Sequence, residues 1–277
     1  MRRRLMLIIV AAGLLAAGTF ACNGAASARV PQTARDISYP QCGHHLPGRD
    51  RVRFGVLGAN GGKAYTRNRC LVAQLAWSKR LAEPPAFYAN TGNPGPKRSE
   101  HWPTGQTSPR VCAAADLNSL NCSYDYGWNA ALHSFTVATD AAQTLHHVAR
   151  ADAVQRVANV DWWLDVEILN SWQTLDNGAT QIAQQRDTAT LAGAVNALWE
   201  AGVRRVGIYS TAYQWNRITG GSSVTHDWFR ANPVWLAGFN NHDHARRGCA
   251  TTSFTGGPVA MTQYLGRDGL DADVICE

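Results

Sequence analysis

One short segment, Trp162–Glu167, carries the side chains of this chain that are best suited to chemistry. Successive side chains of a β-strand point to opposite faces, so the carboxyl groups of Asp165 and Glu167 share one face with Trp163, while the other face is wholly apolar. Two carboxyls on neighbouring rungs of one strand can hold each other's pKa values apart, which hydrolysis of a glycosidic bond requires. The alternative is a structural pair bound by arginine or backbone N–H groups, and this segment alone does not decide between the two.

Strand-like and helix-like segments alternate along most of the chain. The predicted strands are Arg35–Tyr39, Arg51–Asn60, Ala86–Asn90, Val160–Glu167, Arg204–Ser210, Pro233–Phe239, Val259–Tyr264 and a short piece near Asp273. The predicted helices are Cys70–Leu81, Tyr126–Ala142, Ala151–Val157 and Thr188–Ala201. Residues 91–122 are rich in Pro, Gly, Ser and Asn and predict a long excursion. The alternation predicts an α/β fold: a parallel sheet or a (β/α)8-type TIM barrel, which can be irregular with fewer than eight helices.

The first 28 residues have the pattern of a secretory signal peptide. Arginines at positions 2–4 precede residues 5–20, which carry no charge, and Ala26-Ser27-Ala28 fits a small-residue cleavage site. We therefore expect removal of residues 1–28 and a secreted, extracellular domain at residues 29–277 that associates with the cell envelope. Lipidation of Cys22 is the alternative. No other run approaches the roughly 20 apolar residues of a membrane helix, so no membrane span is expected.

Cysteine and charge counts bear on the compartment. Of the seven cysteines, cleavage removes Cys22 and leaves six, which suits three disulfides in an oxidising environment. Nearest-neighbour pairing, one of many connectivities that six cysteines allow, joins Cys42 to Cys70, Cys112 to Cys122 and Cys249 to Cys276. Loss of three arginines and no acid lowers the formal net charge from +6 to +3. That mild excess suits an anionic cell wall and does not indicate nucleic-acid binding.

Six short motifs in a fixed order resemble those of the glycoside hydrolase family 25 lysozymes, and more closely those of related secreted bacterial glycoside-hydrolase-like domains. They are Asp36-Ile37-Ser38 with Gln41, Asp165-Val166-Glu167, Ile208-Tyr209-Ser210 with Trp215, Trp235-Leu236-Ala237, Gln263-Tyr264, and a terminal Asp, most simply Asp273 or else Asp271. The resemblance runs from about residue 34 to 276. It implies a single glycoside-hydrolase-like TIM-barrel domain at residues 29–277, whereas the excursion and the six cysteines depart from the lysozyme pattern.

The resemblance also implies catalytic roles. Glu167 would be the general acid that protonates the leaving glycosidic oxygen. Asp165 would remain ionised and stabilise positive charge on the substrate, or would orient a 2-acetamido group as the internal nucleophile. Asp36 and Asp273 would line the same pocket, and for these two a strand-end cap or a salt bridge is an equally good interpretation.

Aromatic and amide side chains supply the candidate substrate contacts. Tyr209, Trp235 and Tyr264 lie on strands of the matched series and are candidates to stack on sugar rings, with core packing as the alternative. Trp163 is a further candidate because it shares the strand face of the two acids. Asn170 and Gln263 are candidates to hydrogen-bond an amide or hydroxyl group of the substrate.

No metal or cofactor is expected. The run His242-Asp243-His244 lacks the spacing of a closed zinc site, and Gly58–Gly62 lacks the glycine spacing of a nucleotide-binding loop. Two functions therefore compete. The first is a secreted, monomeric glycosidase that cleaves cell-wall glycan, namely peptidoglycan, by muramidase-like β-1,4 hydrolysis. The alternative is a catalytically inactive carbohydrate-binding protein of the cell envelope on the same fold.

Overall fold

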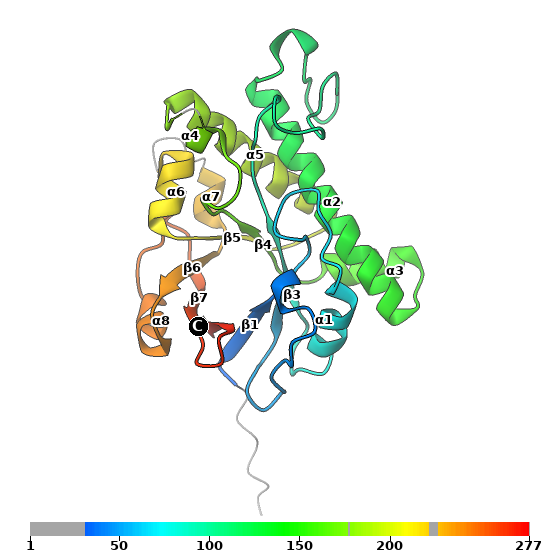
Figure 1. The fold of residues 1–277 in the computed structure, drawn as a ribbon, viewed down its shortest axis with the longest axis vertical. Helices are drawn as coiled ribbons and strands as arrows, with labels where there is room; N and C mark the ends of the chain where they lie inside the picture. Colours follow the sequence, from blue (N-terminus) through cyan, green and yellow to red (C-terminus); the bar gives the residue numbers. More distant parts are fainter. Residues whose placement is uncertain (1–30, 177, 222–226, 277) are drawn as a thin grey trace, which may run out of the picture.

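The computed structural model describes residues 31–176, 178–221 and 227–276, so the predicted signal peptide and Cys22 lie outside the described residues. Eight strands form one closed barrel in chain order (Figure 1). They are β1 (Thr33–Ile37), β2 (Gly55–Gly58), β3 (Ala86–Asn90), β4 (Trp162–Asp165), β5 (Val206–Ser210), β6 (Val234–Phe239), β7 (Val259–Leu265) and β8 (Asp271–Ile275). All eight segments predicted as strands contain one of these strands, or most of it.

Helices follow most, but not all, of the strands. They are α1 (Leu71–Ser78), α2 (Leu120–His146), α3 (Arg150–Ala158), α4 (Gln173–Asp176), α5 (Gln181–Glu200), α6 (Ala212–Thr219), α7 (Asp227–Ala231) and α8 (His242–Gly248). Within the described ranges, the β1–β2 connection holds only a 3-10 turn, and the β7–β8 connection holds no helix. The barrel is thus of the predicted α/β type, with an irregular helical layer. Among the described helices, none combines the length and apolar character needed to cross a bilayer.

The last strand departs from a regular (β/α)8 barrel. Strands β1 to β7 pair in parallel, whereas β8 runs antiparallel to both β7 and β1. Only residues 266–270 connect β7 to β8, and a parallel crossover needs about a dozen residues or more, so this short connection permits only a hairpin. The beginning of β8 therefore lies at the same rim of the barrel as the carboxyl ends of the other strands.

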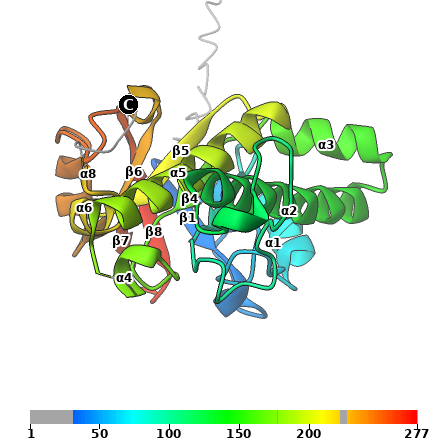
Figure 2. The same cartoon turned by 90° about the horizontal axis from the view of Figure 1, so that it is seen from above.

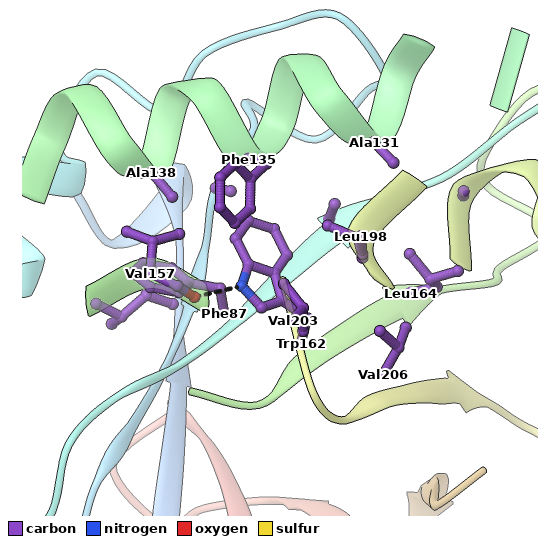
Figure 3. Close-up of a cluster of buried hydrophobic side chains, with 14 of the residues drawn as sticks. Phe87, Ala131, Phe135, Ala138, Val157, Trp162, Leu164, Leu198, Val203 and Val206 are labelled. Carbon is purple, nitrogen blue, oxygen red and sulfur yellow. Dashed lines mark hydrogen bonds between the residues drawn. The ribbon is translucent and has the colours of Figure 1, made fainter. Parts of the chain in front are cut away.

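Strand alternation divides the apolar residues between two layers, as predicted for β4. Trp162 packs outside the barrel under α2, where its ring lies 5.8 Å from that of Phe135, and its Nε1–H donates to the Val157 carbonyl at 3.0 Å (Figure 3). Trp163 points into the barrel and joins the inner apolar cluster. A Cβ at position 207 would lie 2.2 Å from the Trp163 ring, so the glycine of β5 leaves the space that this indole occupies.

The excursion projects beyond one end of the barrel and leads into α2, which lies beside α5 (Figures 1 and 2). The Cys112–Cys122 disulfide ties it to the start of α2, and the backbone of Asn93 pairs with that of Trp172 after β4. The structure also contains the Cys42–Cys70 and Cys249–Cys276 disulfides, which confirms the nearest-neighbour pairing.

Helices α2 and α5 begin six and seven residues before the predicted starts, because serine and threonine caps begin them. Ser119 Oγ accepts a hydrogen bond from the Cys122 N–H, and Thr180 Oγ1 accepts one from the Ala183 N–H. The added turns contain many polar residues, among them Asn121, Ser123, Gln184 and Gln185, and for that reason the apolar pattern alone did not reveal them.

Candidate active site

A cleft of about 360 Å³ opens at the rim formed by the carboxyl ends of β1 to β7 and the start of β8. It contains four carboxyl groups, and we call it the acidic cleft: Asp36, Asp165, Glu167 and Asp271. Seven of the predicted site residues line it: Asp36, Asp165, Glu167, Asn170, Tyr209, Trp235 and Gln263. The structure therefore brings together predicted residues that lie far apart in the chain, such as Asp36 and Gln263, which are 227 positions apart.

Asp165 is the last residue of β4 and is almost fully buried, with 4% of its surface exposed. The side-chain amide of Asn90, the last residue of the neighbouring strand β3, donates to Asp165 Oδ2. Among the described residues Asp165 Oδ1 has no hydrogen-bond partner. A buried carboxyl oxygen without a partner is costly to the folded protein, and in a cleft it marks a point where a ligand can bond.

Glu167 lies two residues beyond β4 and is held by its backbone and its side chain. Its carbonyl accepts a hydrogen bond from Trp172 Nε1–H at 2.8 Å and one from the Asn170 N–H at 3.0 Å. The Gln214 side chain, in the first turn of α6, donates from Nε2 to Glu167 Oε1 at 3.5 Å and accepts the Ile168 N–H at 2.7 Å. Gln214 thus fixes both the carboxyl group of Glu167 and the backbone next to it.

A chain of hydrogen bonds crosses the floor of the cleft. The Tyr209 hydroxyl donates to Gln263 Oε1 at 2.8 Å, and Gln263 Nε2 donates to Asp36 Oδ2 at 2.9 Å. Tyr209 comes from β5, Gln263 from β7 and Asp36 from β1. The hydrogen bonds therefore span the barrel interior and fix the orientation of the Asp36 carboxyl.

The direction of β8 decides which of its two acids reaches the cleft. Asp271, at the start of β8, pairs with Leu265 at the rim, while Asp273 pairs with Gln263 and Ala34 lower in the barrel. Asp271 lines the cleft, and Asp273 is fully buried below it, where Oδ1 accepts a hydrogen bond from Trp235 Nε1–H at 2.9 Å. Of the two candidates for the terminal acid, Asp271 faces the cleft and Asp273 supports its floor.

The carboxyl groups raise one another's pKa. Burial, followed by the charge of Asp271, raises the pKa of Asp36 to about 7. Burial, followed by the charges of Glu167 and Asp36, raises the pKa of Asp165 well above its ordinary range. Burial also raises the pKa of Glu167, against the hydrogen bond from Gln214, which lowers it. The carboxyl groups of this site are therefore harder to ionise than carboxyl groups in water.

This electrostatic arrangement predicts that the protein is more stable in mild acid than above neutral pH. A carboxyl group whose pKa rises from its ordinary 3.8 to about 7 on folding stabilises the fold fully below pH 3.8. That contribution is lost as the pH rises through 7, at roughly 1.4 kcal/mol for each unit of pKa difference. In urea titrations from pH 4 to 8, Asp36→Asn should flatten this decline, whereas the exposed Asp50→Asn should leave it unchanged. Parallel declines for Asp36→Asn and the wild type would contradict the prediction.

Three predicted site residues lie away from the open cleft. Trp163 is buried beneath it, with its ring 5.8 Å from that of Trp235, and Asp273 is buried as described. Tyr264 lies on the opposite face of β7 from Gln263 and contacts the His242 ring outside the barrel, with ring centres 5.7 Å apart. Trp163 and Asp273 therefore support the cleft from below, and Tyr264 belongs to a different surface.

Several cleft residues were not predicted. They are Ser38, Tyr39, Gly62, Lys63, Tyr88, Asn90 and Leu169. Tyr88 and Asn90 alternate along β3 and end it, so the rule that sites gather at the carboxyl ends of strands would have found both. Gln214 had no signal, because nothing in its helix relates it to Glu167, 47 residues earlier. No group of three or more His, Cys, Asp or Glu side chains within the described ranges is arranged to hold a metal ion.

Solved structures with the same fold are muramidases and a family 25 glycosyl hydrolase. A muramidase from Trichobolus zukalii aligns with a TM-score of 0.53 and 15% identity, over 88% of this chain and 92% of its own. GHIP, a glycosyl hydrolase 25 of Streptococcus pneumoniae that participates in host cell invasion, aligns with a TM-score of 0.51 and 14% identity, over 88% and 86%. A muramidase from Acremonium alcalophilum gives 0.51 and 16%, over 89% and 93%.

No family model and no curated protein sequence matches the chain. At these low identities the structural likeness establishes the fold and leaves the activity to be argued from the site. The fold is that of the glycoside hydrolase family 25 muramidases, which confirms the resemblance inferred from the sequence motifs.

Proposed function

We propose that this protein is a glycoside hydrolase that cleaves the glycan of peptidoglycan by a muramidase-like β-1,4 hydrolysis. The observation that carries the proposal is the acidic cleft, in which four carboxyl groups with raised pKa values meet at the active rim of the barrel. Glycosidic bond cleavage needs a carboxyl group that is protonated near the working pH and a negative environment for the positive charge of the transition state.

Glu167 is the general acid of this proposal. Its pKa is raised by burial, its carboxyl group lines the cleft, and Gln214 limits the orientations of that group. These are the conditions under which a carboxyl group can donate its proton to a leaving glycosidic oxygen.

Asp165 stabilises the positive charge that develops on the sugar ring. Burial and the neighbouring acids raise the pKa of Asp165, which means that its negative charge is poorly compensated in the cleft. A positive charge that develops on the sugar next to Asp165 compensates it, so the interaction between the two is strongly favourable. Its unpartnered Oδ1 is also free to bond the 2-acetamido group of an N-acetylated sugar, which would orient that group as the internal nucleophile. Both roles depend on the same negative field, to which Asp36 and Asp271 contribute.

Aromatic side chains form the floor and one edge of the cleft. Trp235 and Tyr209 lie against each other with ring centres 4.4 Å apart, and Tyr88 meets Trp235 edge to face at 6.3 Å. All three line the cleft, and the exposed Tyr39 lies at its edge. Stacking of sugar C–H groups on the exposed ring of Tyr39 would hold the glycan at the cleft, while the buried Trp235 and Tyr209 shape the floor beneath it.

The first test is the release of new reducing ends from purified peptidoglycan and from chitin oligomers by residues 29–277. Release from peptidoglycan supports the proposal, and the response to chitin shows whether the sugar carrying the lactyl ether is required. A folded protein that binds peptidoglycan in a pull-down but releases no reducing ends over a day would contradict it. That outcome would establish the alternative, a carbohydrate-binding protein on a hydrolase fold.

Secretion with residues 1–28 as the signal peptide is part of the proposal. The three disulfides support an oxidising compartment outside the cytoplasm, because such bonds are rare in proteins of a reducing cytoplasm. N-terminal sequencing of the exported protein distinguishes cleavage before Arg29 from cleavage before a lipidated Cys22.

Replacement of Gln214 by Met should change the pH profile of the proposed enzyme as well as its rate. The Gln214 amide lowers the pKa of Glu167, so its loss should move the alkaline limb of kcat/KM to higher pH. Looser positioning of the acid should reduce kcat by about tenfold. The exposed Gln155→Met on α3 is the matched control. A slower Gln214→Met enzyme with an unmoved alkaline limb would show that Gln214 does not act through the Glu167 carboxyl.

A further inference from the structure

A second hollow, of about 920 Å³, lies on the outer side of the barrel wall from the acidic cleft and is lined by residues of α8 and of the β7–β8 turn. Strand alternation places the two sites back to back. Gln263 lines the cleft and the next residue, Tyr264, lines the hollow; Asp36 lines the cleft and its neighbour Arg35 lines the hollow. Only the thickness of the barrel wall therefore separates the hollow from the cleft.

Positive charge dominates this hollow, which we call the basic groove. The charged and aromatic side chains that define it are Arg35, His242, His244, Arg247, Arg267 and Tyr264, and Asp243 is the only acid in its lining. Arg35 pairs with Asp268 at 3.0 Å, beside the groove. Arg247 and Arg267 are exposed and form no ion pair with any side chain that the structure describes. Two guanidinium groups thus remain free to bind an anion.

The shape and chemistry of the groove suit a short acidic peptide. A guanidinium group presents paired N–H donors that match the two oxygens of a carboxylate. Asn240 and Asn241 add side-chain amides, and Tyr264 adds an aromatic face with a hydroxyl group. The volume lies within the roughly 300–1,000 Å³ range of pockets that enclose small ligands.

We propose that the basic groove binds a carboxylate of the peptide branch carried by the glycan in the acidic cleft. The inference rests on the proposed function, because peptidoglycan is a glycan that bears short peptides with free carboxylates. The lining of the cleft holds four acids and a single lysine, Lys63, whereas the lining of the groove holds three arginines and a single acid. A carboxylate is therefore bound more favourably in the groove than in the cleft. This difference orients the substrate, so that the neutral sugars enter the cleft and the peptide branch lies along α8.

The test compares two disaccharide–peptide ligands that differ only in whether the peptide carboxylates are free or amidated. Binding is measured by calorimetry to residues 29–277 carrying Glu167→Gln, so that no turnover occurs, and to the same protein with Arg247→Gln and Arg267→Gln added. The free carboxylate form should bind about tenfold more tightly than the amidated form, as expected for two partly exposed charge pairs. The arginine variants should abolish this preference, and 0.5 M salt should reduce it. Both arginines are exposed, and a thermal melt confirms that the variants fold.

Other outcomes overturn the proposal. Equal binding of the free and amidated ligands, or a preference that survives both arginine substitutions, would show that the groove does not bind the peptide carboxylate. Arginine-dependent binding of a poly(glycerol phosphate) oligomer without any peptide preference would assign the groove to a phosphate polymer instead. Cleavage of peptide-free glycan chains is measured separately. Cleavage without carboxylate preference removes the groove proposal alone, and a preference without cleavage removes the proposed enzyme while the groove remains.

Discussion

Glu167→Gln is expected to eliminate the release of reducing ends from peptidoglycan, with a loss of about 10²–10⁴-fold, the range that general acid catalysis contributes. Gln keeps the size of the side chain and its hydrogen bond with Gln214 but has no proton to donate near neutral pH. Because Glu167 is half-buried with a raised pKa, its replacement by a neutral amide should not destabilise the fold. A loss of activity at unchanged thermal stability is therefore the expected signature.

The measurement needs a control for the general effect of removing an acid. Glu200→Gln is well matched, since Glu200 is an exposed residue at the end of α5 and lies outside the cleft. It should retain the full rate. If Glu167→Gln retained more than a tenth of the wild-type rate, another carboxyl of the cleft would have to supply the proton, and Asp36, with a pKa of about 7, would be the next candidate.

Short-range patterns in the sequence were sufficient to locate the centre of the site. The two-residue alternation of β4 put Asp165 and Trp163 on one face of the strand and Trp162 on the other, apolar face. In the structure Asp165 and Trp163 lie inside the barrel and Trp162 packs outside it. The reason is that side chains on a strand point to one of two faces, and the wholly apolar face is the one that packs against the helices outside the barrel.

The alternation of side chains along a strand, applied to β7 as well, would have improved the prediction of the cleft residues. Gln263 and Tyr264 are neighbours on one strand, so they cannot both line one cleft, and the structure places Tyr264 in the basic groove. Likewise, the five residues between β7 and β8 are too few for a parallel crossover. Recognition of that hairpin would have selected Asp271 over Asp273 as the rim acid. Gln214 is different, because its contact with Glu167 depends on how α6 docks after β5, and no local pattern encodes that docking.

Asp165→Asn is expected to have the second largest effect, and its consequences for activity and for stability should have opposite signs. Loss of the negative charge that stabilises the transition state should lower kcat by about 10²–10³-fold, as expected when one electrostatic contact is removed. The amide should keep the hydrogen bond with Asn90, because its carbonyl oxygen accepts from the Asn90 side chain as Asp165 Oδ2 does. Substrate affinity, measured as KM, should change much less than kcat.

Stability should rise in this variant, and only above acid pH. The pKa of Asp165 is raised well above its ordinary value by burial and by the neighbouring acids, so ionisation at high pH opposes folding. A neutral Asn removes that opposition. Urea unfolding should show Asp165→Asn to be more stable than the wild type at pH 8 and equal to it at pH 4, with the exposed Asp50→Asn as the reference. An inactive variant with a stability gain that is the same at both pH values would mean that the gain comes from packing and not from the charge of Asp165. If both results are obtained, the carboxyl group of Asp165 lowers the stability of the fold at high pH and is nevertheless required for the reaction. That combination is expected of a residue whose role is in catalysis and not in folding.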